Sequence, residues 1–232
     1  QFVQADAASR RGLTQVLGDM ESFPLAVSIL KPMLWLLPIL LILGFLKSPA
    51  FKGWFGEKLV SKKASLRLPQ GDYFLYDNVT IPDGVGTTQI DHIYVSRFGV
   101  FVVETKNMSG WIFGRADQSQ WTQSIYKRKH KFQNPIRQNF KHLKTLEGLL
   151  QLPASKLHTV IVFTGDSTFK TDLPKCVCTL SNFIDYIKSF STPLLTGDEV
   201  SEVRSKIESG RLTASRSTHT AHVEYLRSKH RQ

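Results

Sequence analysis

Two apolar runs joined by a short polar turn stand out in the middle of the chain, between Thr87 and Lys106 (TTQIDHIYVSRFGVFVVETK). Both runs are rich in β-branched and aromatic residues, which are typical of strands. Residues 96–99 (SRFG) lie between the runs, and Gly99 can adopt the positive φ that a tight turn needs. The pattern therefore predicts two adjacent strands in a hairpin.

The flanking segments alternate between helical and strand-like patterns. Helices are predicted over 51–68, 134–150, 181–190 and 198–209, and further strands over 73–79, 110–114, 121–125, 158–164 and 177–180. Asn134 and Pro135 suit the N-cap and first turn of the second helix. The basic segment 126–131 (YKRKHK) is interpreted as an exposed connection. The order of helix, three strands, helix and strand predicts an α/β domain with a mixed central sheet.

Residues 24–46 (PLAVSILKPMLWLLPILLILGFL) are apolar, small or proline at every position except Lys31. The segment is close to the roughly 20 residues that cross the hydrocarbon core, and its prolines are tolerated in a membrane helix. We expect a single transmembrane helix here. The unbroken part, 33–46, is also compatible with a buried core helix, an interfacial segment or the apolar region of a signal peptide.

Basic residues flank this segment unequally. Only Arg10 and Arg11 precede it, whereas the following residues include Lys47, Lys52, Lys58, Lys62, Lys63 and Arg67. The positive-inside rule then predicts a single-pass membrane protein with its C-terminal domain in the cytoplasm. A signal peptide would instead export the domain, but the Lys-rich flank fits that alternative poorly.

The chain of 232 residues carries a formal net charge of +11. Such a surplus favours polyanionic partners, either nucleic acid or anionic lipid head groups, although the basic cytoplasmic face of a membrane protein would also explain it. Cys176 and Cys178 (KCVC) are too close for good disulfide geometry and do not have zinc-site spacing. Both are expected to be small, buried or half-buried side chains.

Three charged residues interrupt the apolar hairpin: Asp91, Glu104 and Lys106. Glu104 and Lys106 are two positions apart, so on a strand they point to the same face. Burying them is costly unless they are used. Two carboxylates can hold a hard cation such as Mg²⁺, and a lysine can stabilise charge or orient a water, as a phosphodiesterase requires. A structural ion-pair network at the end of a sheet is the alternative.

Three stretches together resemble the NERD, or nuclease-related, domain: IDHIYVSRFGVFVVETKNMSGWIFG, the following NPIRQNFKHLK, and the leading GEKLV with the later DNV. The resemblance covers about residues 50–165. The family is similar to restriction-endonuclease-like nucleases with a PD-(D/E)xK core, which implies a mixed central sheet flanked by helices. We therefore expect a tail at 1–23, a transmembrane helix at 24–46, the nuclease-like domain at 50–165 and a mostly helical extension at 166–232.

The resemblance also implies roles for individual residues. Asp91 and Glu104 would bind Mg²⁺ or Mn²⁺, with Glu57 on the leading helix completing the metal site. Lys106 would be the catalytic lysine, and Gln138 matches a helix glutamine near the active site of related nucleases. Glu57 and Gln138 could instead be ordinary helix-surface residues. Ile90 stands where the family pattern has proline, a common variation.

Basic residues that follow the hairpin are candidates for nucleic-acid binding: Lys127, Arg128, Lys129, Lys131, Arg137 and Lys141. Tyr126, Phe132 and Phe140 are interleaved with them and could stack on bases. A solvated loop and helix face is the alternative. Trp111 and Trp121 are expected in the core, and His92 is expected to pack on the side opposite Asp91.

The sequence thus predicts a membrane-anchored, Mg²⁺-dependent nuclease that hydrolyses phosphodiester bonds of nucleic acid, with DNA favoured. A non-catalytic, membrane-tethered module for nucleic-acid binding or signalling is the alternative from another class. A purely structural module is a third.

Overall fold

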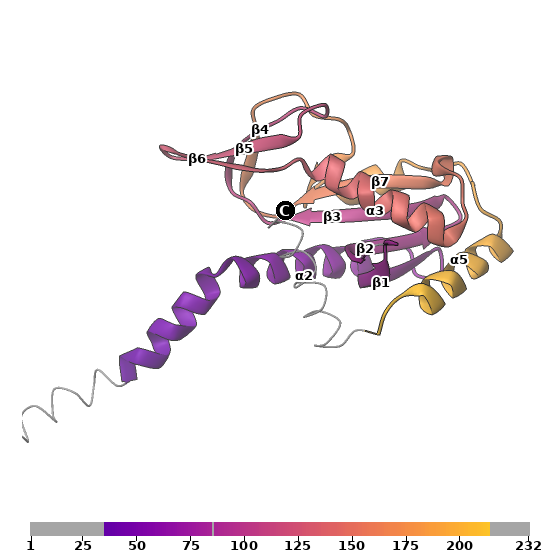
Figure 1. Ribbon diagram of the computed structural model, residues 1–232, viewed down its shortest axis with the longest axis horizontal. Helices are drawn as coiled ribbons and strands as arrows, with labels where there is room; N and C mark the ends of the chain where they lie inside the picture. Colours follow the sequence, from indigo (N-terminus) through magenta and orange to yellow (C-terminus); the bar gives the residue numbers. More distant parts are fainter. Residues whose placement is uncertain (1–34, 85, 214–232) are drawn as a thin grey trace, which may run out of the picture. The chain divides into compact units, whose positions relative to one another are not determined.

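The computed structural model describes residues 35–84 and 86–213 (Figure 1). The chain divides into two compact units, residues 1–52 and residues 53–232. The predicted tail 1–23 and the first part of the predicted membrane segment, 24–34, lie outside the described residues.

The first unit contains the helix Trp35–Lys47, whose large apolar side chains are exposed along its length. In the described part of the chain, no single helix is both long and apolar enough to cross a membrane. This helix and the following α2 (Pro49–Arg67) meet the requirements of length and composition only together, as a bent pair. Of the transmembrane helix predicted over 24–46, the structure describes only residues 35–46.

The second unit is built on a five-stranded sheet in the order β1-β2-β3-β7-β9. Its strands are β1 (Tyr73–Pro82), β2 (Thr87–Ser96), β3 (Gly99–Lys106), β7 (Leu157–Phe163) and β9 (Val177–Thr179). The first three strands pair antiparallel, whereas β7 pairs parallel to both β3 and β9. This confirms the mixed central sheet predicted from the order of the elements. The predicted hairpin turn is also confirmed, with Gly99 at φ 119°.

A second sheet has the order β6-β5-β4-β8. Its strands are β4 (Gly110–Phe113), β5 (Gln120–Ile125), β6 (Arg128–Gln133) and β8 (Ser167–Phe169). The interpretation of 126–131 as a connection was wrong from Arg128 onwards, because each residue of β6 pairs with one of β5 and only Tyr126 and Lys127 form the turn. Its run of charged residues suits an exposed edge strand.

Helices cover both faces of the five-stranded sheet (Figure 1). They are α3 (Pro135–Leu150), α4 (Phe183–Lys188) and α5 (Gly197–Gly210), together with α2 and a short 3₁₀ helix (Ala154–Lys156). Leucines of α3 and valines of α5 pack on one face with Ile93 and Val102. On the other face, α2 and α4 pack against Tyr94 and Phe101. Strand alternation produces this division, because neighbouring residues of β2 and β3 point to opposite helical layers.

The two tryptophans of the second sheet differ from each other. Trp121 is buried with Ile112 and Phe163, as predicted. The prediction that Trp111 lies in the core was wrong, because 53% of its surface is exposed. The two residues belong to neighbouring strands, but they occupy opposite faces of the sheet.

Candidate active site

The strands β2 and β3 separate where the two candidate carboxylates lie. Their ladder ends at the pair His92–Val103, one position before Asp91 and Glu104 would face each other. Instead of a ladder bond, the backbone N–H of Thr105 donates to Oδ2 of Asp91 over 2.8 Å. The separation leaves both carboxylates at the end of the β2–β3 hairpin ladder rather than within it.

The neighbouring strand β1 is irregular at the same level. Asn78, which the register places opposite Asp91, is missing from the β1–β2 ladder and has φ 52°. Its side-chain oxygen accepts a hydrogen bond of 3.0 Å from Gln89 Nε2. Left-handed backbone is uncommon outside glycine, and such positions often cluster at functional sites.

Glu104 and Lys106 form an ion pair on β3, with 2.7 Å between Lys106 Nζ and Glu104 Oε1. The same Nζ donates a hydrogen bond of 2.9 Å to Oε1 of Gln138 on α3. Glu104 is only 3% exposed, whereas Lys106 is partly open to solvent. The structure thus brings together three of the residues that the sequence nominated.

The sequence reasoning missed His142 and Thr88. His142 Nε2 lies 3.3 Å from Glu104 Oε2, and its Nδ1 lies 2.7 Å from the hydroxyl of Thr88. The contact with Glu104 is electrostatic rather than a well-aligned hydrogen bond, since neither atom has a hydrogen-bond partner among the described residues. The spacing of four residues from Gln138 was the available signal, because it places both on one side of α3.

The electrostatics of Asp91 and Glu104 differ. Burial raises the pKa of Asp91 well above its ordinary value, and the charges of Glu104 and Glu57 add to the effect. Burial also raises the pKa of Glu104, but the interactions with His142 and Lys106 outweigh it, so the net shift is downwards. Neighbouring carboxylates whose pKa values are shifted in opposite directions by their surroundings are common at functional sites.

Glu57 belongs to the middle of α2, which begins at Pro49, two residues before the predicted start of the leading helix. Its pKa is raised by burial, partly offset by His92 and increased again by the charge of Glu104. The preceding Gly56 lets the helix approach closely: a Cβ there would lie 2.7 Å from Thr164 Oγ1 and 2.9 Å from Asn107 Cβ. Thr164 directly follows β7 and Asn107 directly follows β3. The close approach of α2 therefore holds Glu57 at the end of the sheet where Asp91 and Glu104 lie.

His92 is buried on the α2 side of the sheet, as expected for the residue after Asp91. Its Nδ1 lies 2.7 Å from Oδ1 of Asp77, and Ser61 on α2 donates a hydrogen bond to the other oxygen of Asp77. These contacts join α2 to the first two strands and so support the position of Glu57.

The candidate metal ligands do not form a ready-made site. Among residues 35–84 and 86–213, no group of three or more His, Cys, Asp or Glu side chains is arranged to hold a metal ion. Each oxygen of Glu104 already has a basic side chain beside it, Lys106 at one and His142 at the other.

The candidate nucleic-acid residues fall into two groups. Lys127 and the basic residues of β6 are exposed on the second hairpin. The two residues on α3 have partners: Arg137 Nη2 donates to the carbonyl of Asp117 over 2.6 Å, and Lys141 Nζ lies 3.0 Å from Asp83 Oδ2.

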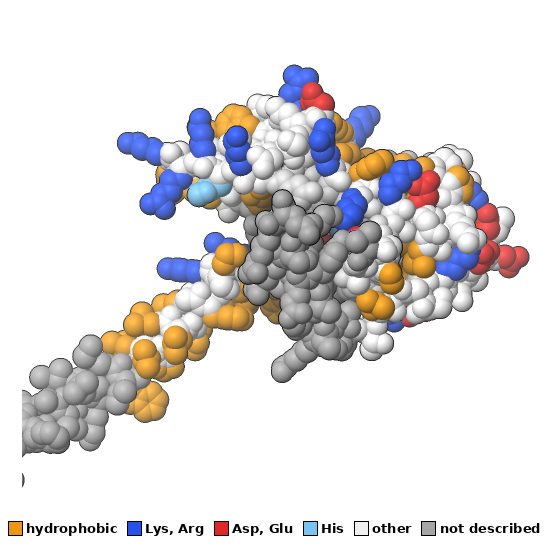
Figure 2. Space-filling view, viewed as in Figure 1, with side chains coloured by type: hydrophobic (Ala, Val, Ile, Leu, Met, Phe, Trp, Pro, Cys, Tyr) orange, Lys and Arg blue, Asp and Glu red, His pale blue; other side chains and the backbone are white. Residues whose placement is uncertain are grey.

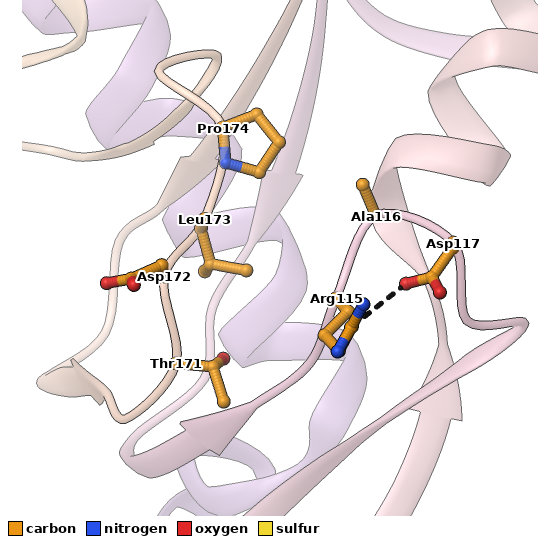
Figure 3. Close-up of a pocket in the computed structure, with 7 residues that line it drawn as sticks. All are labelled: Arg115, Ala116, Asp117, Thr171, Asp172, Leu173 and Pro174. Carbon is orange, nitrogen blue, oxygen red and sulfur yellow. Dashed lines mark hydrogen bonds and ion pairs between the residues drawn. The ribbon is translucent and has the colours of Figure 1, made fainter.

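One pocket, of about 590 Å³, lies between the loops that follow β4 and β8 (Figure 3). Arg115 and Asp117 pair with each other on one wall, and the opposite wall is formed by Thr171, Asp172, Leu173 and Pro174. None of the predicted site residues lines it. A second pocket, of about 530 Å³, is lined by residues of β4, β5 and β8, including Trp111.

Comparison with known proteins gives one family and one curated relative. The family described as "Nuclease-related domain" (NERD) matches residues 52–164. An uncharacterized protein of Bacillus anthracis is 37% identical over an alignment of 195 residues, and the match covers 78% of this chain and 86% of the relative. No solved structure gives a significant match.

Proposed function

Because the chain belongs to the nuclease-related domain (NERD) family, we propose that it is a metal-dependent nuclease with a restriction-endonuclease-like PD-(D/E)xK core. The reaction is hydrolysis of phosphodiester bonds in nucleic acid, with DNA as the first substrate to test. The single observation that carries the proposal is the cluster of Glu104, Lys106 and Gln138 beside Asp91, where β2 and β3 separate.

The chemistry of the donors fits a hard divalent cation. Asp91, Glu104 and Glu57 are close enough that the charge of one raises the pKa of another, as the shifts of Asp91 and Glu57 indicate. Mg²⁺ and Mn²⁺ prefer carboxylate oxygens, and a cation between these groups would relieve their repulsion. When bound, the cation would polarise the phosphate and lower the pKa of a water.

The protein groups supply positioning and charge. The ammonium of Lys106 stabilises negative charge on the phosphate or orients the attacking water. Gln138 holds that ammonium from α3, while His142 restrains the second oxygen of Glu104. The backbone N–H of Thr105 donates a hydrogen bond to one oxygen of Asp91. This bond fixes the orientation of the Asp91 carboxylate at the end of β3.

The test is cleavage of supercoiled, linear, single-stranded and RNA substrates by the purified chain with Mg²⁺ or Mn²⁺. We expect cleavage that EDTA stops and that Glu104→Ala or Lys106→Ala abolishes. Lys144→Ala, which removes an exposed lysine of α3, is the matched control and should cleave normally. A folded wild-type protein that leaves every substrate intact would overturn the proposal.

One observation favours a second candidate, a non-catalytic nucleic-acid-binding or signalling module. Both oxygens of Glu104 already contact side chains of the protein, and this closed arrangement is compatible with a purely structural ion-pair network. Binding of nucleic acid that persists in Glu104→Ala and Lys106→Ala, together with no cleavage by the wild type, would support this reading.

We also propose that the first unit anchors the domain to the cytoplasmic side of a membrane. Support comes from the exposed apolar side chains of the helix Trp35–Lys47, and from the lysines that follow it. The wild type should remain in the membrane pellet after a carbonate wash, whereas deletion of 24–46 should release the chain. Recovery of the wild type in the soluble fraction would contradict the anchor.

A further inference from the structure

The second sheet has one face on the core and one face towards solvent. Ile112 and Trp121 belong to the inner face, where they pack with Phe163 of β7. Since side chains alternate along a strand, Trp111 and Phe113 lie on the opposite, outer face. The exposure of Trp111 and the burial of its neighbour Ile112 agree with this assignment.

The strand register defines two rows of side chains across the outer face. Lys129, Ser124, Trp111 and Thr168 form the first row, one from each strand of the sheet. The next row consists of Lys131, Thr122 and Phe113. Lys170 extends this row just beyond β8, where its backbone N–H donates a hydrogen bond to the Ile112 carbonyl. The outer face, as these eight residues define it, therefore has aromatic rings in its centre and lysines at both edges.

Trp111 is held in a setting that suits stacking. Its ring has Lys170 Nζ 4.6 Å from the centroid, which is a cation–π contact. Tyr126 stands fully exposed at the adjacent turn. Large aromatic side chains open to solvent and flanked by cations are the usual elements of a surface that stacks unpaired bases.

The pocket of about 530 Å³ lies beside Trp111 and extends to Ser109, Ile125 and Tyr126. Its volume is within the range of sites for small molecules, about 300–1,000 Å³, so a base stacked on Trp111 has room there. One carboxylate, Asp166, also lines it. A carboxylate repels phosphate but accepts hydrogen bonds from N–H groups on base edges, the ring N–H of thymine among them, so we place bases in the pocket and phosphates along the lysines.

We propose that the outer face of the second sheet binds an unpaired strand of nucleic acid, with Trp111 stacking on a base and Lys129, Lys131 and Lys170 contacting phosphates. The proposal rests on the proposed function in taking nucleic acid as the partner, and it narrows the substrate to one with a single-stranded segment. In a duplex the bases are already stacked on one another and are not available to Trp111. Figure 2 shows Lys and Arg side chains gathered over β5 and β6, which complements a polyanion.

The outer face is joined to the candidate active site by a short stretch of chain. Trp111 follows Lys106 by five residues, which span at most about 18 Å when extended. Two backbone hydrogen bonds fix the intervening loop: Thr164 N–H donates to the Lys106 carbonyl, and Gly110 N–H donates to the Asp166 carbonyl. A strand held on the outer face therefore stays close to the carboxylates.

The experiment is fluorescence anisotropy with labelled oligothymidylate, alone and as its duplex with oligoadenylate, in EDTA so that nothing is cut. We expect Trp111→Ala to weaken binding of the single strand about fivefold to a hundredfold and to change duplex binding little. Trp54→Ala is the matched control, because Trp54 is 52% exposed, nearly the same as Trp111 at 53%, but lies on α2. It should bind like the wild type.

Three outcomes would overturn the inference: unchanged single-strand binding by Trp111→Ala, an equal loss for both oligonucleotides, or an equal loss in Trp54→Ala. Vesicles with anionic lipid serve as a further probe, and a dependence on Trp111 there but not with oligothymidylate would also overturn it. A separate assay with Mg²⁺ distinguishes the two proposals. If the wild type cleaves but Trp111→Ala does not selectively lose single-strand binding, only the inference about the outer face fails. If Trp111→Ala selectively loses single-strand binding but the wild type does not cleave, only the nuclease proposal fails.

Discussion

Lys106 on β3 donates a hydrogen bond of 2.9 Å from its ammonium to the side-chain oxygen of Gln138 on α3. The two residues are 32 positions apart in the sequence, and only the packing of α3 on the sheet brings them together. Since Glu104 holds the same ammonium from its other side, the position of Nζ depends on both contacts.

Gln138→Met, which keeps the shape of the side chain but removes its oxygen, tests this contact. We expect the nuclease kcat to fall about tenfold or more with little change in KM, because a hydrogen bond to a charged group contributes about 1.5–3 kcal/mol. Single-turnover cleavage would measure the effect. Gln120→Met, at an exposed position of β5, is the control. An unaltered rate in Gln138→Met would show that Glu104 alone positions the lysine.

Asp91→Asn should stabilise the metal-free protein while abolishing cleavage. Burial and the charge of Glu104 both disfavour the ionised Asp91, and the amide removes this charge but keeps an oxygen for the Thr105 N–H. A gain of about 1 kcal/mol would raise Tm by about 2–4 °C in a chain of this size. Thermal unfolding in EDTA measures it. A lower Tm would mean that ionised Asp91 stabilises the fold, which would contradict the cost expected from its burial and from the charge of Glu104.

Much of the second unit follows from local sequence pattern. Alternation and turn chemistry around Gly99 located the hairpin, and Asn134 does cap α3, accepting a hydrogen bond of 2.9 Å from the Ile136 N–H. The candidate site residues could be named from the sequence for a similar reason. Glu104 and Lys106 are two positions apart on one strand, and Asp91 lies on the neighbouring strand.

The rest depends on contacts that no local pattern encodes. Trp111 and Trp121 both lie in short strands, and only the second sheet's position against β7 decides which of the two is buried. The strand character of Arg128–Gln133 was hidden because exposed edge strands lack an apolar face. The role of His142 could not be inferred from its four-residue spacing from Gln138 alone, because only the packing of α3 on the sheet brings His142 to Glu104.

Gly56→Ala tests whether the approach of α2 positions Glu57. The added Cβ would overlap Thr164 and Asn107, so the helix must shift, and displacements of about 1 Å can cost about a hundredfold in rate. We expect a clear loss of cleavage and a lower Tm. Gly53→Ala lies in the same helix with nothing near its Cβ, and it should raise stability by about 0.5–1 kcal/mol. Normal cleavage by Gly56→Ala would exclude a positioning role for the close packing.

Cys178 should be inert towards alkylation in the folded protein. Burial raises the pKa of this thiol to about 12, with a smaller contribution from Cys176. Near pH 8 the reactive thiolate is therefore scarce in the folded state, and iodoacetamide should react at least about a hundredfold more slowly than after unfolding. The measurement uses mass spectrometry on Cys176→Ser, which leaves one thiol. Rapid alkylation of the folded variant would show that the thiol is accessible and ionisable.

The alternation of β6 makes a prediction about the salt dependence of binding. Lys129 and Lys131 belong to the outer face, whereas Arg128 and His130 point to the other side of the same strand. Each phosphate contact on a single strand contributes about 0.7 to the slope of log K against log salt. Lys129→Ala combined with Lys131→Ala should therefore reduce that slope for oligothymidylate by about 1.4. Arg128→Ala removes one exposed charge from the same strand and should change the slope by less than either lysine variant alone. Titrations at several salt concentrations measure the slope for each of these variants. An equal contribution from Arg128 would mean that general charge, not the outer face, binds the strand.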